Sequence, residues 1–194
     1  REEIGLRRFV ESPFAHPSVV FRKELVRRLG GYREGVFPED YELWLRWMEG
    51  GACMEKLPAV LLRWRDHENR LSRCDERYSS DAFYRMKLSY LHLWLERHNP
   101  FYPVVKVWGA GRTTRGRARY LEEAGTRITG YYDLDPRKIG QPRKDLTVLS
   151  IDEIPPRGKE FIIAMVGARG AREKVAYFLK ARGYREGIDF MLAA

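Results

Sequence analysis

The chain has 194 residues, 44% of them hydrophobic, so it is long enough to bury a core in one large or two small domains. Its formal net charge of +9 attracts anions, but no long basic block or aromatic-interleaved motif accompanies this charge, so we expect no nucleic-acid binding. No run of about 18 uncharged apolar residues predicts a membrane-spanning helix. The cysteines, Cys53 and Cys74, lack metal-ligand or redox spacing, which indicates reduced thiols in a cytosolic protein.

The N-terminal part of the chain predicts a strand, a short helix and a glycine turn. Residues 19–21, Val-Val-Phe, predict a short buried strand. Residues 23–29 predict a helix that Gly30 and Gly31 end, because glycine commonly follows a helix. His16 precedes the strand; a lone histidine is more often a hydrogen-bonded structural residue than a site residue, and we keep both interpretations.

The next predicted helix opens with two adjacent carboxylates. Pro38 suits a turn or first helical position, and Glu39 and Asp40 suit the positive end of the helix dipole. Apolar residues follow at helical spacing and predict a face that anchors the helix in a core: Leu43, Trp44 and Trp47. Two interpretations remain open from this spacing: Asp40 caps the helix by binding free N–H groups, or it is a general base at the mouth of the helix.

Two more strands and a long helix are predicted after Gly50 and Gly51 end the acidic helix. Residues 53–57 and 60–64 read as strands joined at a proline, and the second strand leads to Arg65 and His67. Residues 78–98 predict a long helix with apolar residues on several sides. We expect this helix to pack in a core; the alternative is a surface that binds an upstream part of the protein, a second copy of the chain or a membrane.

Four segments between residues 13 and 72 occur in the order typical of one enzyme family. All four resemble segments of family 2 glycosyltransferases. Residues 13–22, with the first strand, resemble the strand beneath the acceptor site, and Leu-Gly-Gly-Tyr at residues 29–32 resembles the Gly-Gly-aromatic turn. Pro-Glu-Asp-Tyr-Glu-Leu-Trp-Leu-Arg at residues 38–46 resembles the acidic helix, and residues 61–72, with the last strand and its Arg-x-His tail, resemble the closing strand.

This resemblance implies an α/β fold in which residues 1–100 are the acceptor-side portion of a GT-A glycosyltransferase catalytic domain. The chain begins at Arg1 without methionine. We therefore expect a C-terminal piece of a longer bacterial protein, inactive without an upstream donor-binding half that carries an aspartate-x-aspartate metal motif. The implied activity is inverting transfer of a sugar from a nucleotide-diphosphate sugar to a glycan or lipid-linked acceptor in cell-surface polysaccharide synthesis. The implied location is the cytoplasm, with peripheral association at the inner face of the membrane as an alternative.

The resemblance also implies roles for individual residues. Asp40 is the expected catalytic base, with Glu39 as its helper. His16 and Arg65 are expected to contact substrate, and so is Trp44 if it stacks on a sugar instead of packing the helix. His67 is expected near the donor diphosphate and its Mg²⁺ or Mn²⁺, because the equivalent histidine in many relatives approaches that metal. One histidine alone does not make a metal site.

A second domain is predicted over residues 101–194, after an Asn-Pro-Phe-Tyr-Pro break in the helical pattern. A strand at residues 104–108, a Gly-Ala-Gly turn, a helix at residues 112–124 and a second strand at residues 127–132 lead to Asp133, which is the order of a dinucleotide-binding unit. The fingerprint is incomplete, because Thr114 replaces its third glycine. In one interpretation Gly109 and Gly111 let a nucleotide phosphate approach, Arg112 adds charge and Asp133 binds a ribose. In the other, the glycines only make the turn and Asp133 caps the next loop.

The rest of the chain continues the alternation of strands and helices. We predict strands at residues 146–149, 161–166 and 189–192, and a helix at residues 171–182, hence a Rossmann-like parallel sheet covered on both faces. Residues 103–194 look like the small domain appended to some bacterial glycosyltransferases, and residues 132–140 resemble a segment of sugar acyltransferase N-terminal domains. The alternative function is therefore a nucleotide- or dinucleotide-binding module that regulates or localises an enzyme.

Overall fold

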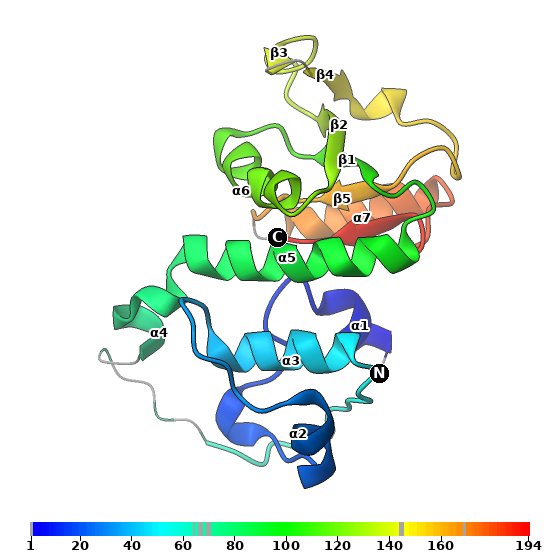
Figure 1. Ribbon diagram of the computed structural model, residues 1–194. Helices are drawn as coiled ribbons and strands as arrows, with labels where there is room; N and C mark the ends of the chain where they lie inside the picture. The colour runs from blue at the N-terminus through cyan, green and yellow to red at the C-terminus, as the bar shows by residue number, and fades with distance from the viewer. Residues whose placement is uncertain (1, 64, 66–67, 69–70, 144–145, 169) are drawn as a thin grey trace. The chain divides into compact units, whose positions relative to one another are not determined.

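The computed structural model describes residues 2–63, 65, 68, 71–143, 146–168 and 170–194 (Figure 1). The chain divides into two compact units, Arg1–Tyr90 and Leu91–Ala194. No helix in the described part of the chain is long and apolar enough to cross a membrane.

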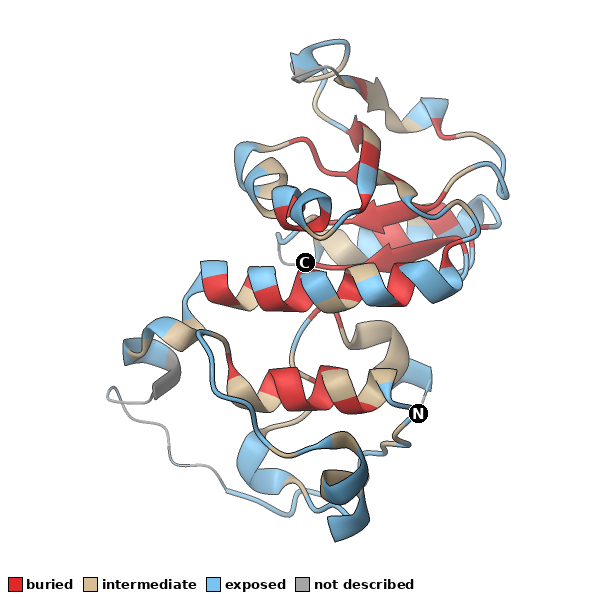
Figure 2. Ribbon diagram, in the orientation of Figure 1, coloured by how far each residue is buried: buried red, intermediate tan, exposed pale blue. Residues whose placement is uncertain are grey.

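The first unit is built from helices joined by extended segments. Its elements are α1 (Glu2–Arg7), η1 (His16–Ser18), α2 (Lys23–Leu29), α3 (Glu39–Glu49), α4 (Leu71–Cys74), η2 (Glu76–Tyr78) and the first part of α5 (Ser80–His98). The predicted apolar face of the acidic helix is confirmed, because Leu43, Trp44 and Trp47 of α3 are buried and pack against Phe14 and residues of α2. The burial pattern along α3 is visible in Figure 2.

The prediction of strands in the first unit is wrong. Among its described residues, 19–21, 53–57 and 60–63 have no strand pairing, although the chain there is not helical. Val20 is 99% exposed and Val60 is 93% exposed, so the apolar pattern that predicted buried strands does not lead to burial here. A strand exists only when a neighbouring strand accepts its backbone hydrogen bonds, and the described part of this unit supplies no such neighbour.

The second unit is a single sheet with helices. Its elements are β1 (Val104–Trp108), α6 (Arg112–Glu123), β2 (Arg127–Asp133), β3 (Pro142–Arg143), β4 (Leu146–Ser150), η3 (Ile151–Glu153), β5 (Ile162–Ala164), α7 (Ala171–Ala181) and β6 (Phe190–Leu192). The strand order is β3-β4-β2-β1-β5-β6; β3 is antiparallel to β4, and the other neighbours are parallel. Numbered along the chain, the parallel strands run 3-2-1-4-5, which is the Rossmann order, so the predicted α/β class is confirmed.

The sequence explains why these strands are parallel and central. All three residues of β5 and of β6 are buried, and such continuous apolar runs are typical of parallel strands covered on both faces (Figure 2). The chain leaves β1 toward β2 through α6, and it leaves β5 in the opposite direction toward β6 through α7. Right-handed crossovers in opposite directions place the two helices on opposite faces of the sheet. The direction therefore reverses between β1 and β5.

Candidate functional site

The acidic helix α3 begins at Glu39, and Pro38 occupies its N-cap position without a side-chain cap. Asp40 is thus the second helical residue, and its Oδ1 accepts a hydrogen bond of 2.8 Å from the backbone N–H of Tyr41. The carboxylate lies within the first turn of α3, where the amide groups have no intrahelical acceptors. The Asp40 side chain is half buried in this place.

The two adjacent carboxylates have different partners. Glu39 accepts hydrogen bonds from the hydroxyl of Tyr78 at 3.0 and 3.1 Å and lies 3.8 Å from the Arg77 guanidinium. Among the residues that the structure describes, Asp40 has no side-chain hydrogen-bond donor. Burial, and then the charge of Glu39, raise the pKa of Asp40, although the Tyr41 hydrogen bond and the charge of His16 act in the opposite direction. Glu39 is therefore occupied by structural contacts, and Asp40 is available to a ligand.

His16 and Tyr32 stand beside this acid pair. The Nε2 atom of His16 lies 2.7 Å from the Tyr32 hydroxyl, and the two rings are 5.3 Å apart between centroids. The pKa of Tyr32 is raised, first by burial and then by the negative charges of Asp40 and Glu39. The structure thus brings together the predicted residues His16, Glu39 and Asp40. The sequence had indicated Tyr32 only as the aromatic residue of the Gly-Gly turn.

Two residues of α3 that the sequence analysis did not single out hold the glycine turn. Arg46 forms a two-pronged ion pair with Glu42, at 2.9 Å from Nε and 3.1 Å from Nη2. The same guanidinium donates to the carbonyl oxygens of Leu29, Gly30 and Gly31, the last at 2.6 Å. These contacts fix the backbone that immediately precedes Tyr32. The final arginine of the acidic helix motif was the available signal for this role.

The other substrate residues predicted in the first unit have different surroundings. Trp44 is 2% exposed and packs edge-on against Phe14, with 5.8 Å between ring centroids. Its indole N–H has no acceptor in the described part of the chain, and the residue lines a pocket of about 670 Å³ with Phe14, Phe21 and Met54. Arg65 is exposed.

The predicted metal ligand, His67, lies outside the described residues. Within them, no group of three or more His, Cys, Asp or Glu side chains is arranged to hold a metal ion. The expected Mg²⁺ or Mn²⁺ therefore stays a prediction for the full-length protein.

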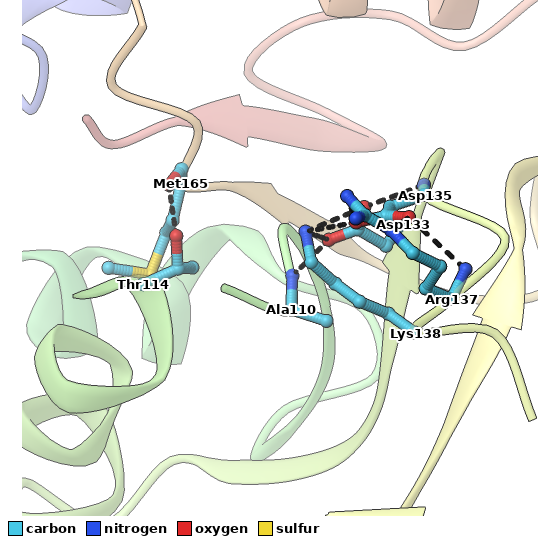
Figure 3. Close-up of polar contacts among 7 residues, drawn as sticks. All are labelled: Ala110, Thr114, Asp133, Asp135, Arg137, Lys138 and Met165. Atoms are coloured by element: carbon cyan, nitrogen blue, oxygen red, sulfur yellow. Dashed lines mark hydrogen bonds and ion pairs between the residues drawn. The ribbon is translucent and has the colours of Figure 1, made fainter. Parts of the chain in front are cut away.

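In the second unit, the glycine turn between β1 and α6 packs tightly at one residue and is open at the other. Gly109 has φ +115°, and a Cβ atom built there would lie 3.2 Å from the Thr114 methyl group. Thr114, which replaces the third fingerprint glycine, donates its hydroxyl to the Met165 carbonyl at 3.1 Å (Figure 3). Gly111 is the N-cap of α6 at φ −65°, and a Cβ there would meet nothing within 4 Å.

Asp133 connects this glycine turn to the next loop (Figure 3). Its carboxylate accepts the N–H of Ala110 at 2.8 Å, the N–H of Asp135 at 2.9 Å and the Lys138 ammonium at 3.0 and 3.2 Å. Burial would raise the pKa of Asp133, but these hydrogen bonds together lower it. The arrangement matches the loop-capping interpretation, and binding of a ribose here stays a prediction. Arg112 is exposed at the first position of α6.

Comparison with known proteins finds three relevant similarities. The chain is 39% identical over 83 residues to the amylovoran biosynthesis glycosyltransferase AmsE of Erwinia amylovora, and the matched segment covers 41% of this chain and 31% of AmsE. It is 41% identical over 51 residues to the UDP-Gal:alpha-D-GlcNAc-diphosphoundecaprenol beta-1,3-galactosyltransferase of Escherichia coli, covering 26% of this chain and 18% of that protein. It is 32% identical over 76 residues to the O-antigen biosynthesis glycosyltransferase WbnJ of Escherichia coli, covering 38% of this chain and 30% of WbnJ.

These similarities are partial. Each match spans less than a third of the curated relative. No protein-family model matches the chain, and no solved structure matches it. The predicted resemblance to a fragment of a bacterial glycosyltransferase is confirmed by the three relatives, whereas the GT-A assignment stays a prediction.

Proposed function

We propose that this chain belongs to a bacterial glycosyltransferase that moves a sugar from a nucleotide-diphosphate sugar to an acceptor hydroxyl with inversion, and that Asp40 is its catalytic base. The similarity to three bacterial glycosyltransferases supports the reaction class. One structural observation carries the assignment of the base: Asp40 is a half-buried carboxylate with a raised pKa and no side-chain donor among the described residues, while its neighbour Glu39 is bound by Tyr78.

The proposed chemistry is a single displacement. The acceptor oxygen forms a bond to the anomeric carbon as the bond from that carbon to the diphosphate oxygen breaks, and the nucleoside diphosphate leaves. The acceptor hydroxyl gives its proton to the Asp40 carboxylate, which must lie within about 3 Å of that hydroxyl. A raised pKa suits this role, because a base whose pKa is closer to the working pH takes a proton more readily. Attack on the face opposite the leaving group inverts the anomeric configuration.

The remaining residues of this site are proposed to orient the acceptor. The paired His16 and Tyr32 present an imidazole and a phenol beside Asp40, and both groups form hydrogen bonds of the kind that sugar hydroxyls make. Glu42 and Arg46 act through the backbone, because they hold the turn that carries Tyr32.

The relatives suggest the class of acceptor. Their names specify amylovoran synthesis, O-antigen synthesis and transfer to a diphosphoundecaprenol-linked sugar. We therefore propose a glycan or lipid-linked acceptor in polysaccharide synthesis, a cytoplasmic location and peripheral association with the inner face of the membrane. The pocket of about 670 Å³ is lined in part by the aromatic side chains of Phe14, Phe21 and Trp44, which supports an acceptor that is partly apolar.

The test is Asp40→Asn in the natural full-length polypeptide that carries this chain, assayed for transfer of labelled sugar to lipid-linked acceptors with Mg²⁺ or Mn²⁺ present. We expect transfer to fall by about two to four orders of magnitude, as loss of a general base should cause, with donor affinity unchanged. Glu39→Gln is the matched control, because it neutralises the adjacent carboxylate that Tyr78 already binds, and it should retain much more activity. Retention of wild-type transfer by Asp40→Asn would remove Asp40 from the chemistry.

A further inference from the structure

The second unit contains a pocket that the proposed glycosyl transfer does not use. It has a volume of about 380 Å³ and lies at the carboxyl ends of β1, β2 and β5, where Trp108, Asp133 and Val166 form part of its wall. Ligands of open α/β sheets bind in the crevice outside the carboxyl ends of the strands, where the direction of the connections reverses. In this sheet that point lies between β1 and β5. The position and the size are both those of a small-molecule site.

The lining of the pocket combines two kinds of groups. Trp108 and Phe178 pack edge-on, with 5.3 Å between ring centroids, and together with Ile151 they supply an apolar wall. Gly111 and Ala171 also line the pocket and bring in the glycine turn and the first turns of α6 and α7. Neither helix has a side-chain cap. Their first amide groups lack intrahelical acceptors, although that of Ala171 donates to the Ala168 carbonyl at 3.0 Å, and positive partial charge gathers at both helix starts.

The charged side chains of the pocket favour an anion. Lys138 is neutralised, because it pairs with Asp133 at 3.0 Å and with Asp135 at 3.8 Å. Lys174 of α7 also lines the pocket, and no carboxylate of the described residues pairs with it. The cavity as a whole, more than either helix end, thus combines apolar lining residues with the Lys174 ammonium and the positive starts of two helices. A nucleotide has the matching properties, because its aromatic base is flat and its phosphate is an anion.

We propose that this pocket binds a nucleoside phosphate, with its base against the apolar wall and its phosphate at the start of α6 near Lys174. Asp133 orders the site, because its carboxylate holds the N–H of Ala110 and so fixes the turn that contains Gly111. Thr114 occupies the place of the third glycine and lines the pocket, and its hydroxyl donates to the Met165 carbonyl. This proposal is independent of glycosyl transfer by the first unit.

The test is calorimetric titration of the 194-residue chain with UDP and ADP, and separately with uridine, adenosine and inorganic phosphate. We expect one nucleotide site that weakens as salt is added, with a nucleoside or phosphate alone binding much more weakly. Gly111→Val should abolish binding, because Gly111 lines the pocket and a side chain there extends into open space without strain. Gly116→Val is the matched control, since a Cβ at this α6 residue also meets nothing within 4 Å and Gly116 is not part of the lining.

A second pair of variants tests the charge. Lys174→Gln should weaken nucleotide binding about tenfold, the effect of losing a charged hydrogen bond, whereas Lys159→Gln removes an exposed lysine outside the pocket and should change nothing. Asp40→Asn should also leave binding unchanged, which separates this site from the proposed transferase site. The proposal fails if no nucleotide binds, if phosphate alone binds as tightly as UDP and ADP, or if the Gly111 and Lys174 variants bind like the wild type.

Discussion

Replacing Arg46 with methionine tests the arrangement that holds Tyr32 beside the acid pair. The Arg46 side chain is 11% exposed and its partner Glu42 is 4% exposed, so Arg46→Met leaves a buried carboxylate without its main cation. Breaking a buried ion pair from one side costs about 3–5 kcal/mol. The hydroxyl of Tyr90, 2.5 Å from Glu42, and the more distant Arg33 at 3.7 Å remain as partners. We therefore expect Arg46→Met to lower the free energy of unfolding by about 3 kcal/mol, the lower end of this range.

This loss should be visible in both stability and local structure. For a unit of this size, each kcal/mol shifts Tm by roughly 4–8 °C, so about 3 kcal/mol lowers Tm by roughly 12–24 °C. Thermal and urea unfolding followed by tryptophan fluorescence measure the change. The indole N–H of Trp47 donates to the Gly30 carbonyl at 3.0 Å, so its NMR signal reports the turn directly. We expect that signal to move in Arg46→Met.

Two comparison variants make the result specific. Arg27→Met removes an exposed arginine that lies 4.0 Å from exposed Glu24, and it should cost less than about 1 kcal/mol. The double variant Glu42→Met/Arg46→Met should recover part of the lost stability, because no charge is then left buried. A loss below about 1 kcal/mol for Arg46→Met, with an unshifted Trp47 signal, would refute the inference that this guanidinium holds the turn.

Two further predictions concern Asp40 and the glycine turn of the second unit. The folded state raises the pKa of Asp40, so the contribution of this carboxyl to stability is fully present below the pKa of an unfolded aspartate, about 3.9, and is lost as pH rises through the folded pKa. Asp40→Asn should thus lower the free energy of unfolding by no more than about 0.5 kcal/mol at pH 7. In urea titrations, the stability of this variant relative to wild type should increase as pH rises from 3 to 7. The opposite trend would mean that the fold favours the charged form of Asp40. Gly109→Ala should destabilise the chain by about 1–3 kcal/mol, because φ is +115° and Thr114 is too close, whereas Gly111→Ala should be nearly neutral. Equal Tm values for the two alanine variants would contradict this difference.

The elements of the second unit follow closely from local sequence patterns. The predicted strand at β1 and the helices at α6 and α7 coincide with the structure to within a residue, because apolar runs and glycine turns mark their ends. The two-residue strand β3 was not predicted, since its pairing with β4 depends on a loop that folds back. In the first unit the same apolar patterns wrongly predicted strands, because pairing requires a neighbour that local sequence does not specify.

The sequence by itself determined the acid pair, its place at the start of a helix, the glycine turns and the Rossmann alternation, because these depend on spacing and backbone preference. The tertiary structure decided which carboxylate is available. Tyr78 lies 39 residues along the chain from Glu39, yet its hydroxyl binds that side chain and leaves Asp40 open. It also decided that Asp133 holds the turn at Ala110, 23 residues away, through a hydrogen bond of 2.8 Å. Partners so distant in sequence are set by packing, which no local pattern encodes.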